Sequence, residues 1–377
     1  MIDMKVKRPD TRTDRFSVSP DQSYTIAARL YHDRDFYEDE QREIFHRSWM
    51  FVGHVSELRD PGDYVTAEFA GQRVYVIRSD GGELKAFFNV CQHRGHSLLS
   101  GKGTAKSLIV CPYHAWSYDQ NGSLIAANNC DQVVGFKKQE FDLPTVAVDT
   151  FAGFVFVNLD PDARPMAEVF EGAEEALTKF RAGTEAFTAD DTVLFDIKGN
   201  WKNVGDNLLE CYHCAPAHKA FVDLVDMKTY EVETHKYWSI QYGTCRPQNT
   251  AYNFSSDKDE QFCTLYLWPG LAFAVFPGID GVSTFSFVPT APEITHQAFT
   301  YYGPSAKKSE TEEAAFAYFR DVLGPEDVDL VENVQRGLHS LGYHQGRIMV
   351  DAARSELSEH ALHHFQNLVM SEMADYV

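Results

Sequence analysis

The sequence lacks several features, and each absence narrows what the chain can be. It has no run of roughly 18 or more apolar residues, so we expect no transmembrane helix. Its N-terminal residues lack the apolar segment of a secretory signal. Neither a G-x-G-x-x-G nucleotide fingerprint nor the C-x4-C-x2-C spacing of a plant-type ferredoxin is present. A direct reaction with NAD(P)H is therefore not expected.

Basic residues and cysteines are also few. The chain has 34 Lys and Arg against 55 Asp and Glu, a net charge of −21, which argues against a nucleic-acid partner. Its seven cysteines are an odd number, so we expect no disulfide framework and a reducing, cytoplasmic setting. A length of 377 residues with 44% hydrophobic residues fits a soluble protein of two domains.

Two short Cys/His motifs are the strongest chemical signal. CQH at 91–93 is followed after seventeen residues by CPYH at 111–114. Two thiolates and two imidazoles are the ligand set of a Rieske [2Fe–2S] cluster, in which two Cys hold one iron and two His hold the other. Each motif follows an apolar run, so we expect the ligands on two loops at strand ends. The predicted cluster ligands are Cys91, His93, Cys111 and His114.

The secondary-structure pattern divides the chain. Helical spacing at 34–50 gives way to short strands and turns up to about residue 160, and strands mixed with helices follow. We expect the later helices at 200–215, 309–322, 326–341 and 356–372. These patterns predict an α+β fold in which a β-rich domain precedes a domain with an antiparallel sheet flanked by helices. The predicted divisions are 1–45 for an N-terminal tail and helix packed on the second domain, 46–160 for the cluster domain and 161–377 for the second domain.

A second candidate metal site lies further along the chain. His213 and His218 are five positions apart, and we expect Pro216 to break the helix between them so that both imidazoles face one metal. Two His and one carboxylate with open positions form the facial triad of non-haem Fe(II) oxygenases. The spacing does not identify the carboxylate. Cys211 and Cys214 leave a zinc site with the same His pair as an alternative.

Together these motifs resemble the catalytic α subunits of Rieske non-haem iron oxygenases, from about Phe36 to Phe365. CQHRGH…CPYHAW is similar to the family's Rieske signature, and WKNVGDNLLECYHCAPAH to its iron-binding signature. GPEDVDLVENVQRGL resembles the segment that supplies the third iron ligand, which implies Asp327, with Asp329 as runner-up and Glu326 close by. The resemblance implies a helix-grip, START-like catalytic domain that holds one mononuclear Fe(II), beside one [2Fe–2S] cluster.

Glu210, three residues before His213, narrows the resemblance. Most of the family has Asp there, and that carboxylate bridges a Rieske His of one subunit and an iron His of the next. Glu210 would thus link His114 to His213 as an electron bridge. A Glu at this place is similar to the members that oxidise quaternary ammonium compounds. The stretches DNLLECYHC, VQRGL, GRIM and SEHALHHFQ most resemble the oxygenase component of carnitine monooxygenase.

The resemblance implies a two-component monooxygenase. A separate reductase with flavin and its own [2Fe–2S] cluster would supply electrons from NAD(P)H, and O2 would be used to hydroxylate a carbon next to nitrogen. For carnitine the products would be trimethylamine and malic semialdehyde. The alternatives are N-demethylation of glycine betaine or stachydrine, choline oxidation and aromatic-ring hydroxylation. A head-to-tail homotrimer is implied, with neither a membrane nor a nucleic-acid partner.

Substrate-binding residues are harder to identify. An aromatic wall can hold a quaternary ammonium group by cation–π attraction, and the second domain is rich in aromatics. We predict Trp238 and Trp268 in this wall, with Arg246 or His235 as partner of a substrate carboxylate. A Rieske electron carrier without oxygenase activity is the competing class, and the long second domain argues against it.

Overall fold

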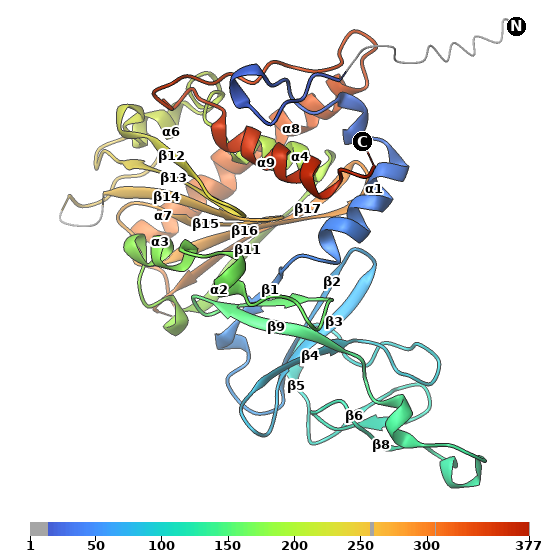
Figure 1. Ribbon diagram of the computed structural model, residues 1–377. Coiled ribbons are helices and arrows are strands. Elements are labelled where there is room, and N and C mark those ends of the chain that lie inside the picture. Colours follow the sequence, from blue (N-terminus) through green and yellow to red (C-terminus); the bar gives the residue numbers. More distant parts are fainter. Residues whose placement is uncertain (1–13, 257–259, 306, 377) are drawn as a thin grey trace, which may run out of the picture.

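The structure is a computed structural model that describes residues 14–256, 260–305 and 307–376. In these residues the strands form two antiparallel sheets of seven strands each and a third of three strands, with most helices gathered around the second sheet (Figure 1). This layout confirms the predicted α+β class. The first thirteen residues, which belong to the predicted N-terminal tail, lie outside the described part of the chain.

The N-terminal half of the chain builds the first large sheet and the small sheet. The large sheet has the strand order β1-β10-β9-β4-β3-β2-β5, and the small sheet, in the order β6-β7-β8, lies at the tip of the molecule (Figure 1). The strands of the large sheet are β1 (Met50–His54), β2 (Asp63–Phe69), β3 (Gln72–Arg78), β4 (Leu84–Phe88), β5 (Lys102–Thr104), β9 (Thr145–Phe151) and β10 (Phe154–Asn158). The small sheet contains β6 (Ile109–Val110), β7 (Ser117–Tyr118) and β8 (Leu124–Ala126).

The turn that contains Gly122 packs the small sheet against the large one. β7 and β8 pair antiparallel across the turn that Asn121-Gly122 predicts. Gly122 has a φ of 85°, and a Cβ there would lie 2.4 Å from the ring of Phe87 in β4. Glycine is therefore required both by the left-handed backbone and by the close contact.

The C-terminal half builds the second large sheet, in the order β11-β17-β16-β15-β14-β13-β12. Its strands are β11 (Thr188–Ile197), β12 (Glu231–Thr234), β13 (Trp238–Thr244), β14 (Gln261–Leu267), β15 (Leu271–Val275), β16 (Val282–Ala291) and β17 (Ile294–Gly303). The helices are α1 (Arg34–Glu40), α2 (Met166–Val169), α3 (Ala173–Phe180), α4 (Trp201–Leu208), α5 (Cys214–Ala217), α6 (Lys219–Leu224), α7 (Glu310–Tyr318), α8 (Gly324–Leu338) and α9 (His360–Glu372). Among the described residues no helix has both the length and the apolar character to cross a membrane.

Two helices are shorter than the sequence predicts. The helix expected at 34–50 is α1, continued by a π-helical turn to Phe45, before β1 starts at Met50. The helix expected at 200–215 ends at Leu208, whose carbonyl accepts a hydrogen bond from the Gln241 side chain of β13. That contact takes a carbonyl at the end of α4, and the chain then turns through residues 209–213.

The segment before the first sheet packs on helices α4 and α9. Glu40 at the end of α1 forms an ion pair with Lys202 of α4 at 2.5 Å, and both side chains are fully buried. The indole N–H of Trp201 donates to the same carboxylate. The hydroxyl of Tyr31 donates to Asp206 of α4 at 2.5 Å. Buried charges need such partners, so these contacts hold the N-terminal segment in one place.

The hydrophobic core has two parts of unequal size. The larger part extends across both large sheets, where Phe154 of β10 contacts Phe273 of β15 with ring centroids 4.7 Å apart. The smaller part surrounds Cys91 and Cys111 and includes Tyr118. The loops that carry the Cys/His motifs therefore rest on a small core of their own.

Candidate iron centres

Two loops with the same backbone geometry carry the Cys/His motifs. The Cys91 carbonyl accepts the N–H of Gly95 at 2.9 Å, and the Cys111 carbonyl accepts that of Ala115 at 3.0 Å. Each cysteine N–H donates to the carbonyl five positions on, at 2.8 Å. Gly95 and Ala115 both have positive φ, 72° and 59°. The two motifs thus form turns with the same hydrogen bonds. Their different Cys-to-His spacings did not predict this similarity.

The four motif side chains converge between these turns. Cys91 and Cys111 are each 2% exposed, and the rings of His93 and His114 are 4.6 Å apart. The Nδ1 atom of His93 is buried without a hydrogen-bond partner in the described part of the chain. Two buried thiols beside two adjacent imidazoles, one with an unpartnered nitrogen, are the donor types that a Rieske cluster requires, so the residues fit this cofactor.

Neighbouring side chains hold these ligands in position. Trp116 stacks on His93, with centroids 4.8 Å apart and planes at 7°. The Tyr118 hydroxyl accepts the N–H of Gln92 at 3.0 Å and lies 3.5 Å from the Cys91 sulfur. Since that hydroxyl already accepts from Gln92, its own hydrogen is free to point at the sulfur. Hydrogen bonds to sulfur are one determinant of a cluster's reduction potential.

The cluster loops open onto the surface. A depression of about 900 Å³ lies beside them, lined by both histidines and by apolar side chains. Tyr113 is 56% exposed there, and its ring contacts His114 with centroids 3.7 Å apart. The imidazole side of this site is therefore accessible from outside.

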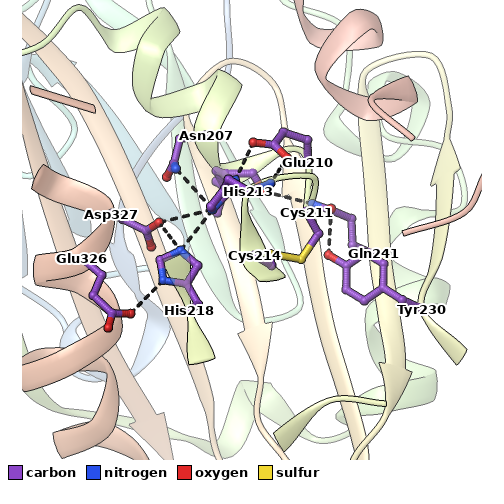
Figure 2. Close-up of a disulfide and its surroundings, with 11 residues drawn as sticks. Asn207, Glu210, Cys211, His213, Cys214, His218, Tyr230, Gln241, Glu326 and Asp327 are labelled. Carbon is purple, nitrogen blue, oxygen red and sulfur yellow. Dashed lines mark hydrogen bonds and ion pairs between the residues drawn. A yellow bond between two sulfur atoms is a disulfide. The ribbon is translucent and has the colours of Figure 1, made fainter. Parts of the chain in front are cut away.

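The second site lies between α4, α5 and α8 (Figure 2). The Nε2 atoms of His213 and His218 are 3.1 Å apart, and Asp327 Oδ1 lies 3.0 Å from His218 Nε2 and 3.6 Å from His213 Nε2. Metal bonds of about 2.1 Å at right angles place donor atoms about 3 Å apart, so this spacing suits one ion. Two imidazoles and one carboxylate are also the donor types of a non-haem iron triad.

Further carboxylates support the two imidazoles from behind. Glu210 accepts the Nδ1 proton of His213 at 2.5 Å, and Glu326 that of His218 at 2.8 Å. Such contacts fix the ring orientation and leave each Nε2 free for a metal. Asp329, the alternative third ligand, points elsewhere and accepts a hydrogen bond from Asn333. Glu326 therefore supports a histidine, and only Asp327 of this acidic group joins the converging donor atoms.

The carboxylates make the site electrostatically favourable for positive charge. Burial by itself lowers the pKa of His213, but hydrogen bonds to Asp327 and Glu210 outweigh it and raise the pKa to about 10. The pKa of His218 is raised in the same way by Asp327 and Glu326, against the effect of burial. Burial raises the pKa of Asp327, and the two histidines lower it overall. A divalent cation would be favoured in the same way.

The short helix α5 sets the angle between the two histidines. His213 precedes its first residue and His218 follows its last. Pro216 does not break a longer helix, as the sequence had suggested, but sits in the first turn of α5, where its missing N–H needs no partner. The chain leaves the helical path at His218, with a φ of −111° and a ψ of 72°.

The cysteines beside His213 are bonded to each other. Cys211 and Cys214 form a disulfide with an S–S distance of 1.95 Å (Figure 2). This bond is one local exception to the expectation of no disulfide framework. Because both sulfurs are used in this bond, the zinc alternative with Cys211 and Cys214 as thiolate ligands does not fit the structure.

A small cavity of about 80 Å³ adjoins the triad. Most of its wall is apolar or aromatic and comes from alternate positions of the second sheet and from the helices around it. The main lining side chains, besides the triad and the disulfide, are Asn207, Leu208, Glu210, Phe221, Tyr230, Gln241, Phe262, Thr264, Phe276, Phe285 and Phe319. A strand exposes every second side chain on one face, and this period was the signal that could have found the sheet residues.

The predicted substrate residues Trp238, Trp268, Arg246 and His235 all lie outside this cavity. Trp238 donates its indole N–H to the Glu171 carbonyl and stacks on His235, with centroids 3.7 Å apart. Trp268 packs on Trp201 in the core. Arg246 donates to three backbone carbonyls and forms an ion pair with Asp226 at 2.9 Å. Each therefore has structural contacts of its own and does not line the cavity.

Two family models match the chain. The Rieske [2Fe-2S] domain matches residues 48–145, and the ring hydroxylating alpha subunit (catalytic domain) matches residues 182–375. Both ranges fall inside the predicted divisions 46–160 and 161–377, whose boundaries stay predictions. The chain belongs to the Rieske non-haem iron oxygenases, as a catalytic α subunit. Membership of this family implies a Rieske cluster and a non-haem iron.

Known relatives place the chain more narrowly. It is 39% identical to the carnitine monooxygenase oxygenase subunit of Escherichia coli (strain K12), over 96% of this chain and 97% of that protein. It is 29% identical to the chloroplastic choline monooxygenase of Atriplex hortensis, over 92% of this chain and 78% of that protein. The predicted resemblance to the quaternary-ammonium-oxidising subgroup is thereby confirmed, and the chain is a Rieske non-haem iron monooxygenase.

Solved structures agree with this placement. The crystal structure of a quaternary ammonium Rieske monooxygenase in complex with L-carnitine matches with a TM-score of 0.86 and 37% identity, over 96% of this chain and 99% of that one. Naphthalene 1,2-dioxygenase from Rhodococcus sp. matches with a TM-score of 0.78 at 18% identity, over 94% of this chain and 95% of that one. The second match concerns the fold alone.

Proposed function

We propose that the chain is the oxygenase component of a two-component monooxygenase that hydroxylates a carbon next to nitrogen in a quaternary ammonium compound. The observation that supports this most directly is the convergence of His213, His218 and Asp327 in a chain that also carries the Cys/His loops. An electron carrier has no need of the second donor group. Bound metal would supply the oxygen chemistry and the cluster would supply electrons, with O2, two electrons and two protons consumed for each hydroxylation and water released.

The protein's own side chains prepare the two sites. We propose Cys91, Cys111, His93 and His114 as the ligands of one [2Fe–2S] cluster, and His213, His218 and Asp327 as the ligands of one Fe(II) per subunit. Glu210 keeps the Nδ1 proton of His213 directed away from the metal, and Glu326 does the same for His218. The partly buried triad and its apolar cavity would hold the substrate away from bulk water.

Electron transfer between subunits is supported by complementary charge. Glu210 lines both the small cavity and a second recess of about 330 Å³, which also contains Asp206 and Glu359. The exposed cluster loops carry Arg94 and His114 and no acidic residue. We infer that the cluster loops of one subunit dock in this acidic recess of the next, in a head-to-tail homotrimer with Glu210 as the electron bridge.

The substrate class rests on the relatives and on the cavity wall. Aromatic faces attract a quaternary ammonium group by roughly 0.5–2 kcal/mol each, and the cavity has several. Carnitine is the first choice because relatives at 39% identity are named carnitine monooxygenase oxygenase subunits. Hydroxylation of the carbon bonded to nitrogen then gives a product that separates into trimethylamine and malic semialdehyde. Choline is the second choice, because the named choline monooxygenases are also similar over most of the chain.

Oxygen uptake with a panel of substrates tests this function. The chain, loaded with both metals and supplied with a flavin/[2Fe–2S] reductase and NADH, should consume O2 with carnitine or choline and release the matching product. Glycine betaine, stachydrine and a few aryl acids complete the panel. Uptake with only the aryl acids would contradict the proposal. Analysis should find three irons per chain, and two irons with intact cluster absorbance would indicate an electron carrier.

The bridge assignment has a test of its own. Glu210→Asp shortens the side chain by one methylene, so its carboxylate no longer reaches both the iron histidine and a neighbouring cluster histidine. We expect both metals to stay bound while coupled turnover falls by about ten- to a hundredfold. Unchanged turnover would remove Glu210 from the electron path.

A further inference from the structure

The sheet side of the small cavity carries two polar side chains among aromatic ones. Gln241 of β13 and Thr264 of β14 are paired directly across the two strands, so their side chains leave the same face of the sheet. Both residues line the cavity, and they are 2% and 7% exposed. They are thus buried polar groups that face the place where a substrate would bind.

The two side chains differ in their hydrogen bonds. The Gln241 amide is held at both ends, because its oxygen accepts the Tyr230 hydroxyl at 2.9 Å and its nitrogen donates to the Leu208 carbonyl at 3.0 Å. The Thr264 hydroxyl makes no hydrogen bond to another described residue. A hydroxyl that lines a cavity can donate one hydrogen bond to a ligand there and accept others from it. Thr264 therefore offers a free donor and acceptor to a ligand in the cavity.

The charge of the cavity decides which ligand group suits this hydroxyl. Among the described lining residues there is no Lys or Arg, and Glu210 and Asp327 are both carboxylates. Fe(II) bound beside them would bring the sum of these charges to zero. A substrate carboxylate buried here would lack a cationic partner, which is costly. The polar group that faces Thr264 is therefore uncharged, and the carboxylate of a ligand such as carnitine would have to lie outside this cavity.

The position of Thr264 relative to the ring of Phe262, one of the aromatic residues of the cavity, limits the length of a ligand that contacts both. Phe262 precedes Thr264 by two residues on β14 and lines the same cavity. Side chains two residues apart on a strand leave one face about 7 Å apart. A cation held over this ring and a group bonded to Thr264 must therefore be joined by a short linker.

We propose that Thr264, held beside Gln241, binds a hydroxyl on the second carbon from the quaternary nitrogen. The chain then prefers a trimethylammonium compound with an N–C–C–OH unit to the same compound without the hydroxyl. Carnitine and choline contain this unit, whereas γ-butyrobetaine, which is carnitine without its hydroxyl, does not. The inference rests on the proposed function and names a finer substrate class for the same cavity.

The expected discrimination follows from one hydrogen bond. A site that binds a substrate hydroxyl disfavours the analogue that lacks it, because the buried protein group is then left unpaired. One neutral hydrogen bond corresponds to about a five- to tenfold difference in the dissociation constant.

Calorimetry with the protein loaded with both metals, under anaerobic conditions, tests the inference. L-Carnitine should bind about five- to tenfold more tightly than γ-butyrobetaine. Thr264→Val, which keeps the shape and removes the hydroxyl, should weaken carnitine to the level of γ-butyrobetaine and leave γ-butyrobetaine unchanged or slightly tighter. Thr264→Ser keeps a hydroxyl and should retain the preference. Iron content and cluster absorbance show that each variant is folded.

The possible results separate this inference from the proposed function. If neither compound binds and no quaternary ammonium compound of the oxygen-uptake panel is turned over, the proposed function is wrong. If both bind equally to the unaltered chain, or if Thr264→Val weakens both to the same extent, the hydroxyl subsite is wrong while the function stands. The comparison of the two ligands on the unaltered chain decides the matter even if a variant fails to fold.

Discussion

The two candidate metal sites use histidine in opposite surroundings. The histidines of the cluster loops border an open depression of about 900 Å³, on a small core of their own. His218 is 2% exposed beside a cavity of about 80 Å³ whose apolar wall belongs to the main core. The carboxylates also differ, because Glu210, Glu326 and Asp327 surround the second site whereas the lining of the depression contains none.

This difference matches two tasks. In the proposed function an electron would enter and leave through a histidine edge that a partner can approach, and the exposed cluster loops provide such an edge. In the proposed function a substrate and O2 would meet at the second site, which has an apolar cavity and imidazoles that are fixed by carboxylates. The predictions below test this division, from the largest expected effect to the smallest.

Loss of Asp327 should affect only the buried site. Asp327→Ala removes one of three converging donors, so we expect the mononuclear iron to be lost and turnover to fall by more than about a hundredfold, beyond the range for supporting residues. Iron analysis, visible absorbance and oxygen uptake measure this. The cluster absorbance should stay. Asp329→Ala, two positions on, is the matched control and should keep both iron and turnover.

The buried ion pair between Glu40 and Lys202 should contribute strongly to the stability of the fold. Lys202→Met leaves Glu40 as an uncompensated buried carboxylate, which should lower the free energy of unfolding by about 3–5 kcal/mol. Urea unfolding followed by tryptophan fluorescence measures the change. Arg34→Met, in an ion pair whose side chains are 81% and 54% exposed, should change stability by less than about 1 kcal/mol. Equal effects would show that burial of the first pair is unimportant.

The free energy of unfolding should depend on pH because of Asp206, which lines the recess beside Glu210. Burial raises the pKa of Asp206 to about 7, although hydrogen bonds from Tyr31 and Gln366 act in the other direction. Because the folded pKa exceeds the ordinary value of 3.8, the contribution of Asp206 is largest at acidic pH and is lost as the pH rises through about 7. The loss should be at most about 1.4 kcal/mol per pH unit.

Asp206→Asn should remove this dependence. The difference in unfolding free energy between variant and unaltered chain should move in favour of the variant between about pH 5 and pH 7. Asp351→Asn is the control, because hydrogen bonds from Ser355 lower the pKa of Asp351 and its charge is constant over that range. A difference that does not change with pH would rule out titration of Asp206.

The smallest effect is expected on the reduction potential of the proposed cluster. Tyr118→Phe removes a hydrogen bond to the Cys91 sulfur, which stabilises the more negative, reduced cluster. A hydrogen bond of about 1 kcal/mol corresponds to roughly 40 mV for one electron, so the potential should fall by about that amount. Protein-film voltammetry measures it. Tyr64→Phe, whose hydroxyl faces the Ser100 carbonyl, should leave the potential unchanged.

Sequence reasoning succeeded where the chemistry is local. The cluster ligands lie in two short motifs after apolar strands, and the structure brings these four side chains together on matched turns. The α+β class and the later helices followed from hydrophobic periodicity, with α7, α8 and α9 close to their predicted ranges. The family followed from the motifs and is confirmed by the comparisons. The ligand assignments themselves stay predictions until metal is analysed.

Sequence reasoning failed where residues that are far apart in the sequence meet in the structure. The spacing of His213 and His218 could not identify a carboxylate more than a hundred positions away, and the family resemblance alone favoured Asp327 over its acidic neighbours. On a helix, residues two positions apart point about 200° from each other, so Asp329 faces away when Asp327 faces the histidines. Trp238 and Trp268 were plausible by residue type, but the strand and core positions that they occupy direct them elsewhere.

The sequence by itself determined the donor atoms, the family and the general class of chemistry, because these depend on residue types at short, fixed spacings. Only the tertiary structure decided which side chains share the cavity, that Cys211 is bonded to Cys214, and that Thr264 faces the cavity beside Gln241. Strand register and the angle of each helix set those neighbours, and both result from the packing of the whole core.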